Sequence, residues 1–583
     1  MPFKIIHLKQ IKNDLYLLSM KKNIVNLLLF LIFPFIIQAQ QKHPTDAFIS
    51  PLDIPLLLSG NFGELRNNHF HAGLDFKTQG REGLSVYAAA QGYVSRIKVG
   101  LYGYGKVIYI THPNGYTSVY AHLQKFSPEI EKYVKQRQYA KKTFEIELFP
   151  KEGELPVNQK QLIGLSGNTG SSGGPHLHFE IRDADSKALN PLWFGYEIAD
   201  NQPPAVYQLW AYSLDNKTQI NGSQVPQSIH FTKQPDGSFL AESVTAEGFL
   251  GLGIQAIDRQ DLTYHNNGVY KVTLQLNGTT QLQYVFDQLD FQQGRYINTF
   301  IDYQQLIENK SRTQLLYKTK SNPLKGIYSV LKNDGKLEIL DGLSYMATVI
   351  VEDFNKNQTR INIPITGKKS PITEQKLPEE GKLLVAKRDQ YFTLDKANVY
   401  FPVNTFYEDF LIQIENKNDT IRIHYPKIPV HRFYNLTIEN TRFAAEELPK
   451  VFIAYVNEKN KIAYENTVRK GQTFSTRTRN LGTFVLMKDD IVPEVTPINF
   501  KNGAWVTDNT LQVAIKDELS GIAQYTATLN GAWVLFEYEA KKGVLTFDFS
   551  DIDTSKTDTY QLELKVADNV GNEQILKMSF RKK

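Results

Sequence analysis

The residues best suited to metal chemistry lie in the segment "HFHAGLDF", which begins at His69. If this segment is a strand, alternate side chains share a face, so His71, Gly73 and Asp75 point the same way and the glycine leaves room between two candidate ligands. A helix would also bring His71 and Asp75 together, but the glycine and the flanking aromatic residues favour a strand. His69 falls on the same side, at a groove edge or on the surface.

A second pair of histidines stands two residues apart in "PHLHFEI". On a strand, His176 and His178 share a face, while the residues between and after them turn to the core. Burying two neutral, unpaired imidazoles side by side would gain little, and a divalent ion removes that difficulty. Glu180 continues the same register, where it either orients a ligand or is an exposed carboxylate.

Zinc suits these side chains, because catalytic zinc sites use three protein ligands from His and Asp or Glu and leave one position for water. His71, Asp75 and one histidine of the pair would supply three ligands, and the other histidine would stand beside the water as a base. The spacing does not decide which of His176 and His178 is the ligand. The chain has no cysteine, so histidine and carboxylate must hold any metal.

A third histidine-bearing element is "YTSVYAHLQ", whose alternation predicts a strand with His122 on the face of Ser118 and Tyr120. A lone strand histidine is usually a polar surface residue. Here, however, residues 69–178 hold half of the 12 histidines of the chain, which favours a common site. Among them, His112 in "THPNG" is interpreted as a turn residue.

In chain order, "HAGLD", "YAHL" and "GNTGSSGGPHLHFE" resemble the three signatures of the lysostaphin-type or LytM-domain zinc peptidases, peptidase family M23. The resemblance covers residues 54–193 and implies a small antiparallel β-sheet with the ion in a groove along it. It implies these roles: His71, Asp75 and His178 as zinc ligands, His176 as general base, and His122 as the residue that helps to polarise water or to steady the transition state. A zinc-bound water would attack a peptide carbonyl while His176 takes its proton.

The resemblance implies an exported zinc endopeptidase that hydrolyses the peptide cross-links of bacterial peptidoglycan. Two alternatives stay open: a catalytically inactive LytM-like activator of another cell-wall hydrolase, and an envelope adhesion or scaffold protein. Inactive relatives typically lack one or more ligands, whereas this chain has them all. Zinc binding together with wall degradation would separate the first function from the other two.

One departure from compact family members is the longer connection at residues 127–156. Ser127, followed by a proline and two glutamates, predicts a helix start, with Ile130, Tyr133 and Val134 on one face. The following "FEIELF" alternates as a strand. We expect this insertion to form one wall of the groove and to restrict the substrate.

After "NQPPAV" the chain becomes a series of alternating strands separated by Asn, Asp and Gly turns. "GVYKVTLQLNG" and "GIAQYTATLNG" both end in a Leu-Asn-Gly turn of the hairpin type, and "VIVEDFNKNQTRINI" and "KVADNVGNEQILKM" both place a turn containing Asp and Asn between two strands. Two modules that resemble immunoglobulin-like (Ig-like) sandwiches explain this internal echo.

The fold class is therefore mainly β, with an N-terminal antiparallel β-sheet peptidase domain followed by several β-sandwich modules. The expected domains are the peptidase at 50–200, an Ig-like sandwich at 202–367, a Pro- and charge-rich linker at 368–383, a β-rich domain at 384–485, and a C-terminal Ig-like sandwich at 486–583.

The first 40 residues have the layout of a secretory signal peptide. From Met20 they contain two lysines, an apolar run from Ile24 to Ile37, and Ala39 near the end. The run is 14 residues long, short of the roughly 20 that span a bilayer. We expect Met20 to be the true start, and the product to be periplasmic, held in the cell envelope or secreted.

The chain carries a formal charge of +5, most of it in this leader, which has five lysines and one aspartate, so the body is near neutral. A near-neutral body argues against nucleic acid as the main partner. The expected partners are the peptidoglycan peptide and an envelope protein bound through the β-modules. Membrane contact is expected only through the leader, if it stays uncleaved.

Overall fold

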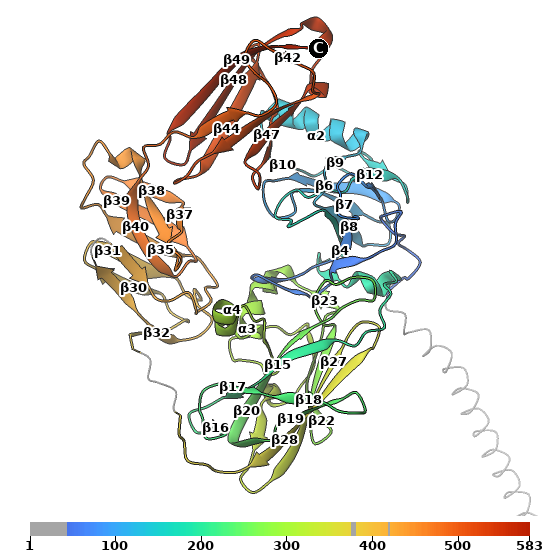
Figure 1. Cartoon of the computed structure of the whole chain (residues 1–583), viewed down its shortest axis with the longest axis vertical. Helices are drawn as coiled ribbons and strands as arrows, with labels where there is room; N and C mark the ends of the chain where they lie inside the picture. The colour runs from blue at the N-terminus through green and yellow to red at the C-terminus, as the bar shows by residue number, and fades with distance from the viewer. Residues whose placement is uncertain (1–42, 375–379, 418–419) are drawn as a thin grey trace, which may run out of the picture. The chain divides into compact units, whose positions relative to one another are not determined.

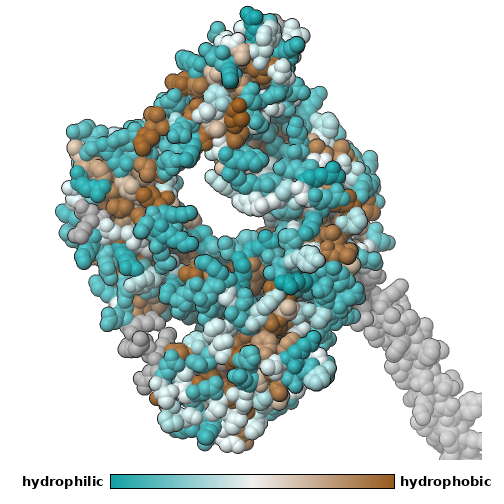
Figure 2. Space-filling model, in the orientation of Figure 1, coloured by the Kyte–Doolittle hydropathy of each residue, from teal (hydrophilic) through white to brown (hydrophobic). Residues whose placement is uncertain are grey.

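The computed structural model describes residues 43–374, 380–417 and 420–583 (Figure 1), and the predicted signal segment lies outside them. Strands far outnumber helices, which confirms the expected mainly β class. No described helix is long and apolar enough to cross a membrane. Hydrophilic residues cover most of the face shown in Figure 2, with apolar residues scattered among them.

The histidine-rich region folds around one antiparallel sheet. Its main strands are β1 (Leu58–Gly60), β4 (Leu74–Lys77), β6 (Gly92–Val99), β7 (Lys106–Thr111), β8 (Thr117–Ala121), β10 (Ile146–Leu148) and β13 (His176–Arg182). In space their order is β1–β4–β13–β8–β7–β6–β10. Shorter pairings are made by β2 (Leu65–Arg66) with β3 (His69–Phe70), and by β5 (Ser85–Tyr87) and β9 (Lys125–Phe126) with β12 (Leu162–Leu165).

The register of β13 determines which side chains meet. His178 lies opposite Asp75 on β4 and opposite Ala121 on β8. Directly opposite residues project to the same face of a sheet, so Asp75, His178 and Glu180 share one face. Phe179 points to the other face, where it is fully buried in the core.

The predicted helix of the insertion is α2 (Pro128–Lys141), preceded by Ser127 as expected. It buries Ile130 and Val134, while Tyr133 stays partly exposed. The predicted strand that follows is β10, which pairs with β6. β10 thus forms one edge of the sheet, and β1 forms the other edge.

The chain beyond residue 200 forms further, almost entirely antiparallel sheets. The long strands of the first module are β15 (Ala205–Ser213), β20 (Val244–Ile257), β21 (Lys271–Leu276), β22 (Thr279–Val285), β27 (Ser344–Glu352) and β28 (Gln358–Gly367), accompanied by the helices α3 (Ile297–Phe300) and α4 (Tyr303–Asn309). β29 (Lys382–Leu384) begins inside the linker that was expected to run to residue 383.

Each of the last two modules has two sheets that enclose an apolar core. The first pairs β30 (Gln390–Leu394), β31 (Ala397–Phe401), β35 (Tyr434–Glu439), β38 (Thr467–Lys470) and β39 (Thr473–Thr478) against β33 (Ile414–Lys417), β34 (Thr420–Ile423), β36 (Val451–Val456), β37 (Ile462–Glu465) and β40 (Gly482–Lys488). The last has β41 (Glu494–Pro497), β43 (Thr510–Lys516), β46 (Glu537–Glu539) and β47 (Val544–Asp548) in one sheet and β42 (Trp505–Val506), β44 (Ile522–Leu529), β45 (Ala532–Trp533), β48 (Thr559–Asp568) and β49 (Glu573–Lys582) in the other.

The internal echo in the sequence is confirmed by two equivalent hairpins. β21 and β22 are joined at Asn277 and Gly278, and β44 and β45 at Asn530 and Gly531. All four residues have positive φ, as the hairpin turn that matches strand twist requires. The second echo is confirmed as well, since β27–β28 and β48–β49 are also antiparallel pairs.

Residues 43–49 and Leu192–Tyr196 form a small unit of their own. In it, the ring of Phe194 lies 5.0 Å from that of His43 and 5.4 Å from that of Phe48.

Candidate metal centre

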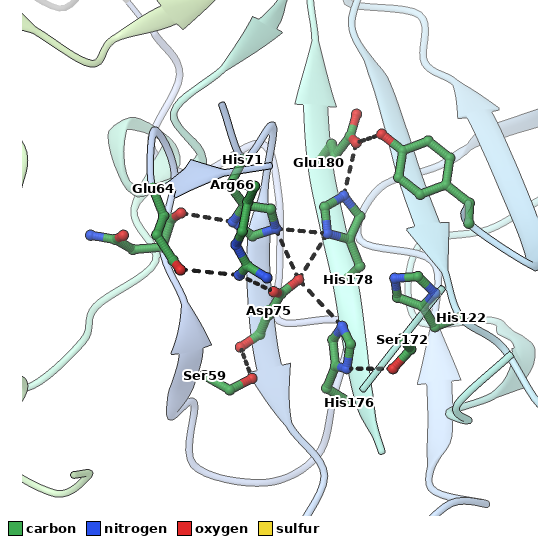
Figure 3. Close-up of polar contacts among 12 residues, drawn as sticks. Ser59, Glu64, Arg66, His71, Asp75, His122, Ser172, His176, His178 and Glu180 are labelled. Atoms are coloured by element: carbon green, nitrogen blue, oxygen red, sulfur yellow. Dashed lines mark hydrogen bonds and ion pairs between the residues drawn. The ribbon is translucent and has the colours of Figure 1, made fainter. Parts of the chain in front are cut away.

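Three side chains bring one ligand atom each to a common point (Figure 3). Oδ1 of Asp75 lies 3.0 Å from Nε2 of His71 and 2.8 Å from Nδ1 of His178, and the two nitrogens are 3.0 Å apart. Each residue is no more than 5% exposed. The structure therefore brings together the three residues that the family resemblance implies as zinc ligands.

The opposite nitrogen of each ligand histidine donates a hydrogen bond away from this point. Nδ1 of His71 donates to the carbonyl oxygen of Asn61 at 2.7 Å, and Nε2 of His178 donates to Oε1 of Glu180 at 2.8 Å. Because a neutral imidazole has one N–H, the two nitrogens that face Asp75 carry lone pairs.

Two lone-pair nitrogens and a carboxylate oxygen cannot hydrogen-bond to one another without an added proton, whereas a cation satisfies all three. Tetrahedral zinc, with bonds of about 2.0–2.1 Å, would hold its ligand atoms about 3.3 Å apart, close to the separations seen here. The residues present therefore fit a zinc ion.

Glu180 is fully buried and accepts a hydrogen bond from His178, so it is not an exposed strand carboxylate. Its Oε2 accepts a hydrogen bond from Nε of Arg182 at 2.6 Å, and its Oε1 accepts another from the hydroxyl of Tyr104. Although burial opposes ionisation, the charge of Arg182 and the bond from His178 lower the pKa of Glu180 to about 2. Glu180 is therefore an anion behind the metal centre.

The charged groups around His178 shift the pKa of this residue. Burial by itself would lower the pKa of His178, but the hydrogen bonds to Asp75 and Glu180 outweigh it and raise the pKa to about 9. Without a metal, a proton on His178 thus supplies the positive charge beside Asp75 that a metal ion would otherwise supply.

Arg66 holds the second oxygen of Asp75. Its Nη2 lies 2.9 Å from Oδ2 of Asp75 and 3.1 Å from Oε2 of Glu64. Burial would raise the pKa of Asp75, but the facing histidines, His71 first, hold it well below its usual range. No local spacing in the sequence links Arg66 to Asp75.

His176 and His122 lie beside the three ligands. Nε2 of His176 is 3.4 Å from Oδ1 of Asp75, and the rings of His176 and His122 are 4.8 Å apart. Nδ1 of His176 donates to the carbonyl oxygen of Gly174 at 2.8 Å, and Nδ1 of His122 donates to that of Thr169 at 2.9 Å. Nε2 of each neutral ring is therefore a lone pair able to accept a proton.

The prediction that His122 shares a strand face with Ser118 and Tyr120 is wrong. β8 ends at Ala121, and Tyr120 lies opposite Phe179, on the face away from the metal centre. His122 has a φ of 59°, in the left-handed region, which turns its ring to the other face. Burial and the neighbouring histidines lower its pKa to about 3, so His122 is neutral.

The continuous strand expected from His69 onward is also wrong. β3 ends at Phe70 and β4 begins at Leu74, so His71 precedes the strand that carries Asp75. Backbone hydrogen bonds fix His71, whose N–H donates to the carbonyl oxygen of Glu64 at 2.9 Å. Gly73 allows β13 to lie close to the backbone at this position, because a Cβ on residue 73 would lie 2.3 Å from the carbonyl oxygen of Phe179.

The two remaining histidines of the segment do not belong to the metal centre. His69 is exposed, and its Nδ1 bonds the carbonyl oxygen of Asn67 at 2.9 Å. His112, expected in a turn, follows β7 but is buried, and its Nε2 bonds Oγ of Ser118 at 2.7 Å on the core face.

A pocket of about 690 Å³ opens beside the centre. It is lined by Ile54, Pro55, Leu57, Ser59, Arg66, Asp75, Lys77, Gln79, Gly80, Gly173, Gly174, Pro175, His176 and His265. None of these residues comes from the insertion at 127–156, so its role as a wall of the groove stays a prediction. The glycine turn before His176 forms one wall of this pocket.

A buried His-Asp-His cluster on an antiparallel sheet, flanked by two lone-pair histidines, is the kind of centre that zinc peptidases use. Comparison with known families agrees: residues 69–142 match the model of Peptidase family M23, and residues 381–489 match that of the Zu5-like domain. The chain thus carries a domain that belongs to peptidase family M23, as the resemblance implied.

Two curated relatives match over this domain. DD-carboxypeptidase/endopeptidase Mpg of Neisseria meningitidis serogroup B is 32% identical over 122 residues, 21% of this chain and 22% of that protein. Peptidoglycan DD-endopeptidase ShyA of Vibrio cholerae is 31% identical over 137 residues, 22% of this chain and 26% of that protein. The match thus spans about a quarter or less of these relatives.

Among solved structures, a zinc-containing peptidase from Vibrio cholerae shares 26% identity. The match covers 26% of this chain and 41% of that chain, with a TM-score of 0.20.

Proposed function

We propose that this chain is an exported zinc metalloendopeptidase that hydrolyses peptide cross-links of bacterial peptidoglycan. The observation that carries the proposal is the convergence of His71, Asp75 and His178, with Nε2 of His176 3.4 Å from Oδ1 of Asp75. The substrate class is supported by the names of the two curated relatives. Export is supported by the layout of residues 1–40 alone.

Zinc, when bound, lowers the pKa of a water toward about 7 and polarises the scissile carbonyl. Nε2 of His176 accepts the proton that the attacking water loses, while the carbonyl oxygen of Gly174 and Oγ of Ser172, 3.2 Å from Nδ1, hold the ring in place. The protonated His176 then returns this proton to the leaving amine.

His122 contributes a second lone pair, on its Nε2, beside the ring of His176. Because Nδ1 donates to Thr169, neutral His122 accepts a hydrogen bond at Nε2 and donates there only after it is protonated. Because its pKa is lowered to about 3, His122 stays neutral and orients the attacking water as a hydrogen-bond acceptor.

The test is digestion of purified peptidoglycan, followed by separation of the released muropeptides. We expect release by the zinc-loaded chain, loss of release with a chelator, and recovery on addition of zinc. His176→Ala should bind zinc and lose release. Equal release by this variant would refute the proposed base, and binding to peptidoglycan without release by the wild type would favour the inactive activator.

A further inference from the structure

A second type of charged cluster occurs in the first module after residue 200. One carboxylate oxygen each of Asp200, Asp258 and Asp353 lies within 4.8 Å of the others. Asp200 precedes β15, Asp258 follows β20, and Asp353 follows β27. Three segments that are distant in sequence thus bring carboxylates, and no histidine, to one point.

The last module repeats this cluster at equivalent places. One oxygen each of Asp489, Asp517 and Asp568 again lies within 4.8 Å of the others. Asp489 precedes β41, Asp517 follows β43, and Asp568 is the last residue of β48. The entry segment, an early strand end and the turn between the last two strands therefore supply the carboxylates in both modules.

The hydrogen bonds behind the turn aspartates are also the same. The backbone N–H and Nδ2 of Asn357 donate to Oδ1 and Oδ2 of Asp353 at 2.8 and 2.7 Å, and those of Asn572 donate to Asp568 at the same two distances. Each asparagine also donates to a carbonyl oxygen of the entry segment, that of Asp200 at 3.2 Å or that of Asp489 at 2.9 Å. The same arrangement is thus built twice, in two different sequences.

Each cluster holds one carboxylate oxygen that has no hydrogen-bond partner among the described residues. Asp258 is 3% exposed, and its Oδ1 accepts no hydrogen bond from any described residue. Asp517 is partly buried, and its Oδ2 also accepts no hydrogen bond from any described residue. Within the described part of the chain, no lysine or arginine forms an ion pair with any of the six aspartates. Burial of several carboxylates together is costly without a cation.

The raised pKa of Asp258 is consistent with the lack of a positive charge beside this cluster. Burial, together with the nearby charges of Asp200 and Asp353, raises its pKa to about 8. A buried aspartate with one unpartnered oxygen, close to two other carboxylates, is a poor arrangement for a protein core and a good one for a cation.

We propose that each aspartate cluster binds one calcium ion. The donors are all oxygens, which suit a hard cation, and calcium accepts carboxylates and carbonyls in flexible geometry, whereas magnesium requires a near-ideal octahedron and retains its waters. Each ion joins the segment that enters a module to the end of a strand and the turn opposite. Calcium therefore stiffens the two points where the chain enters its Ig-like modules.

The test is calorimetric titration of the zinc-loaded full chain with calcium chloride in calcium-free buffer, together with thermal unfolding. We expect two calcium ions per chain, with dissociation constants at or below the roughly 10⁻⁴–10⁻³ M of extracellular calcium modules. Asp258→Asn and Asp517→Asn should each bind one ion, and the double variant none. The His71→Ala variant should still bind two, which excludes calcium at the histidine centre.

Asparagine keeps the shape of aspartate and removes mutual repulsion, so without calcium the variants should unfold no earlier than the wild type. Added calcium should raise the unfolding temperature of the wild type and leave the double variant unchanged. No binding and no shift at about 10 mM calcium, or two ions in the double variant, would overturn the proposal. Magnesium binding as tight as calcium would overturn the choice of ion.

Discussion

Glu180 and His178 form a buried hydrogen bond of 2.8 Å between Oε1 and Nε2, on the side of the imidazole opposite to the metal centre. This bond leaves Nδ1 of His178 as the nitrogen that faces Asp75. A carboxylate placed in this way orients a ligand histidine and increases its basicity. In the proposed zinc site, Glu180 therefore positions His178 and is not itself a ligand.

Replacement of this carboxylate should weaken metal binding. We expect Glu180→Gln, which keeps the shape and removes the charge, to lower zinc affinity by about 10–100-fold. Competition with a chromophoric chelator measures the change. Glu129→Gln on the exposed surface of α2 is the matched control, and an unchanged affinity in the Glu180 variant would contradict the positioning role.

The two lone-pair histidines should matter for turnover and not for metal binding. We expect His176→Ala and His122→Ala each to lower kcat by about 10²–10⁴-fold with zinc still bound. Because both rings face the same water, the double variant should lose much less than the product of the two effects. Release of zinc by either variant would show that the residue is a ligand instead.

Gly73 should be required for the pairing of β4 with β13. In Gly73→Ala the new Cβ would lie 2.3 Å from the carbonyl oxygen of Phe179, and we expect a loss of about 1–3 kcal/mol in the free energy of unfolding, with weaker zinc binding. Gly173→Ala is the control, since a Cβ there meets nothing within 4 Å. Denaturant unfolding measures both, and equal stability would argue against the close approach.

Zinc uptake should depend on pH through His178. Its pKa in the metal-free chain is raised to about 9, so its proton must leave before zinc binds, and affinity should rise about tenfold per pH unit between pH 6 and 8. Affinity that does not vary with pH in this range would contradict the assignment. Glu180→Gln should flatten the dependence, because it removes one of the two bonds that hold the proton.

The same proton links stability to pH in the metal-free chain. Because the folded pKa of His178 lies above the unfolded value of about 6.5, its stabilising effect is complete below pH 6.5 and is lost as the pH rises through about 9. Thermal unfolding of the metal-free chain at pH 6, 7, 8 and 9 should show this loss. Saturation with zinc should remove it.

The sequence by itself determined the chemistry of the ligand set. The order of the three histidine motifs singled out His71, Asp75 and His178, and the Leu-Asn-Gly turns predicted both hairpins. The hairpins are confirmed because they depend on local backbone preferences, whereas the choice of His178 over His176 came from the family resemblance.

Other features were decided only by the tertiary structure. Alternation along a strand predicts a face only while the strand continues, and it fails at His122, where a positive φ turns the ring to the other face. The carbonyl oxygens of Asn61, Thr169 and Gly174 fix the histidine tautomers. Every residue has a backbone carbonyl, so residue types in the sequence do not show which of them accepts a hydrogen bond from a histidine.

Local sequence pattern likewise does not predict the burial of a side chain or the position of an inserted segment. Whether Glu180 is exposed depends on Tyr104 and Arg182 packing over it, and the place of the insertion at 127–156 depends on which sheet edge it joins. The six aspartates meet only because three distant segments of each module come together. The contacts of Glu180 with Tyr104 and of the aspartates with one another join residues far apart in the chain, so only the folded structure determines them.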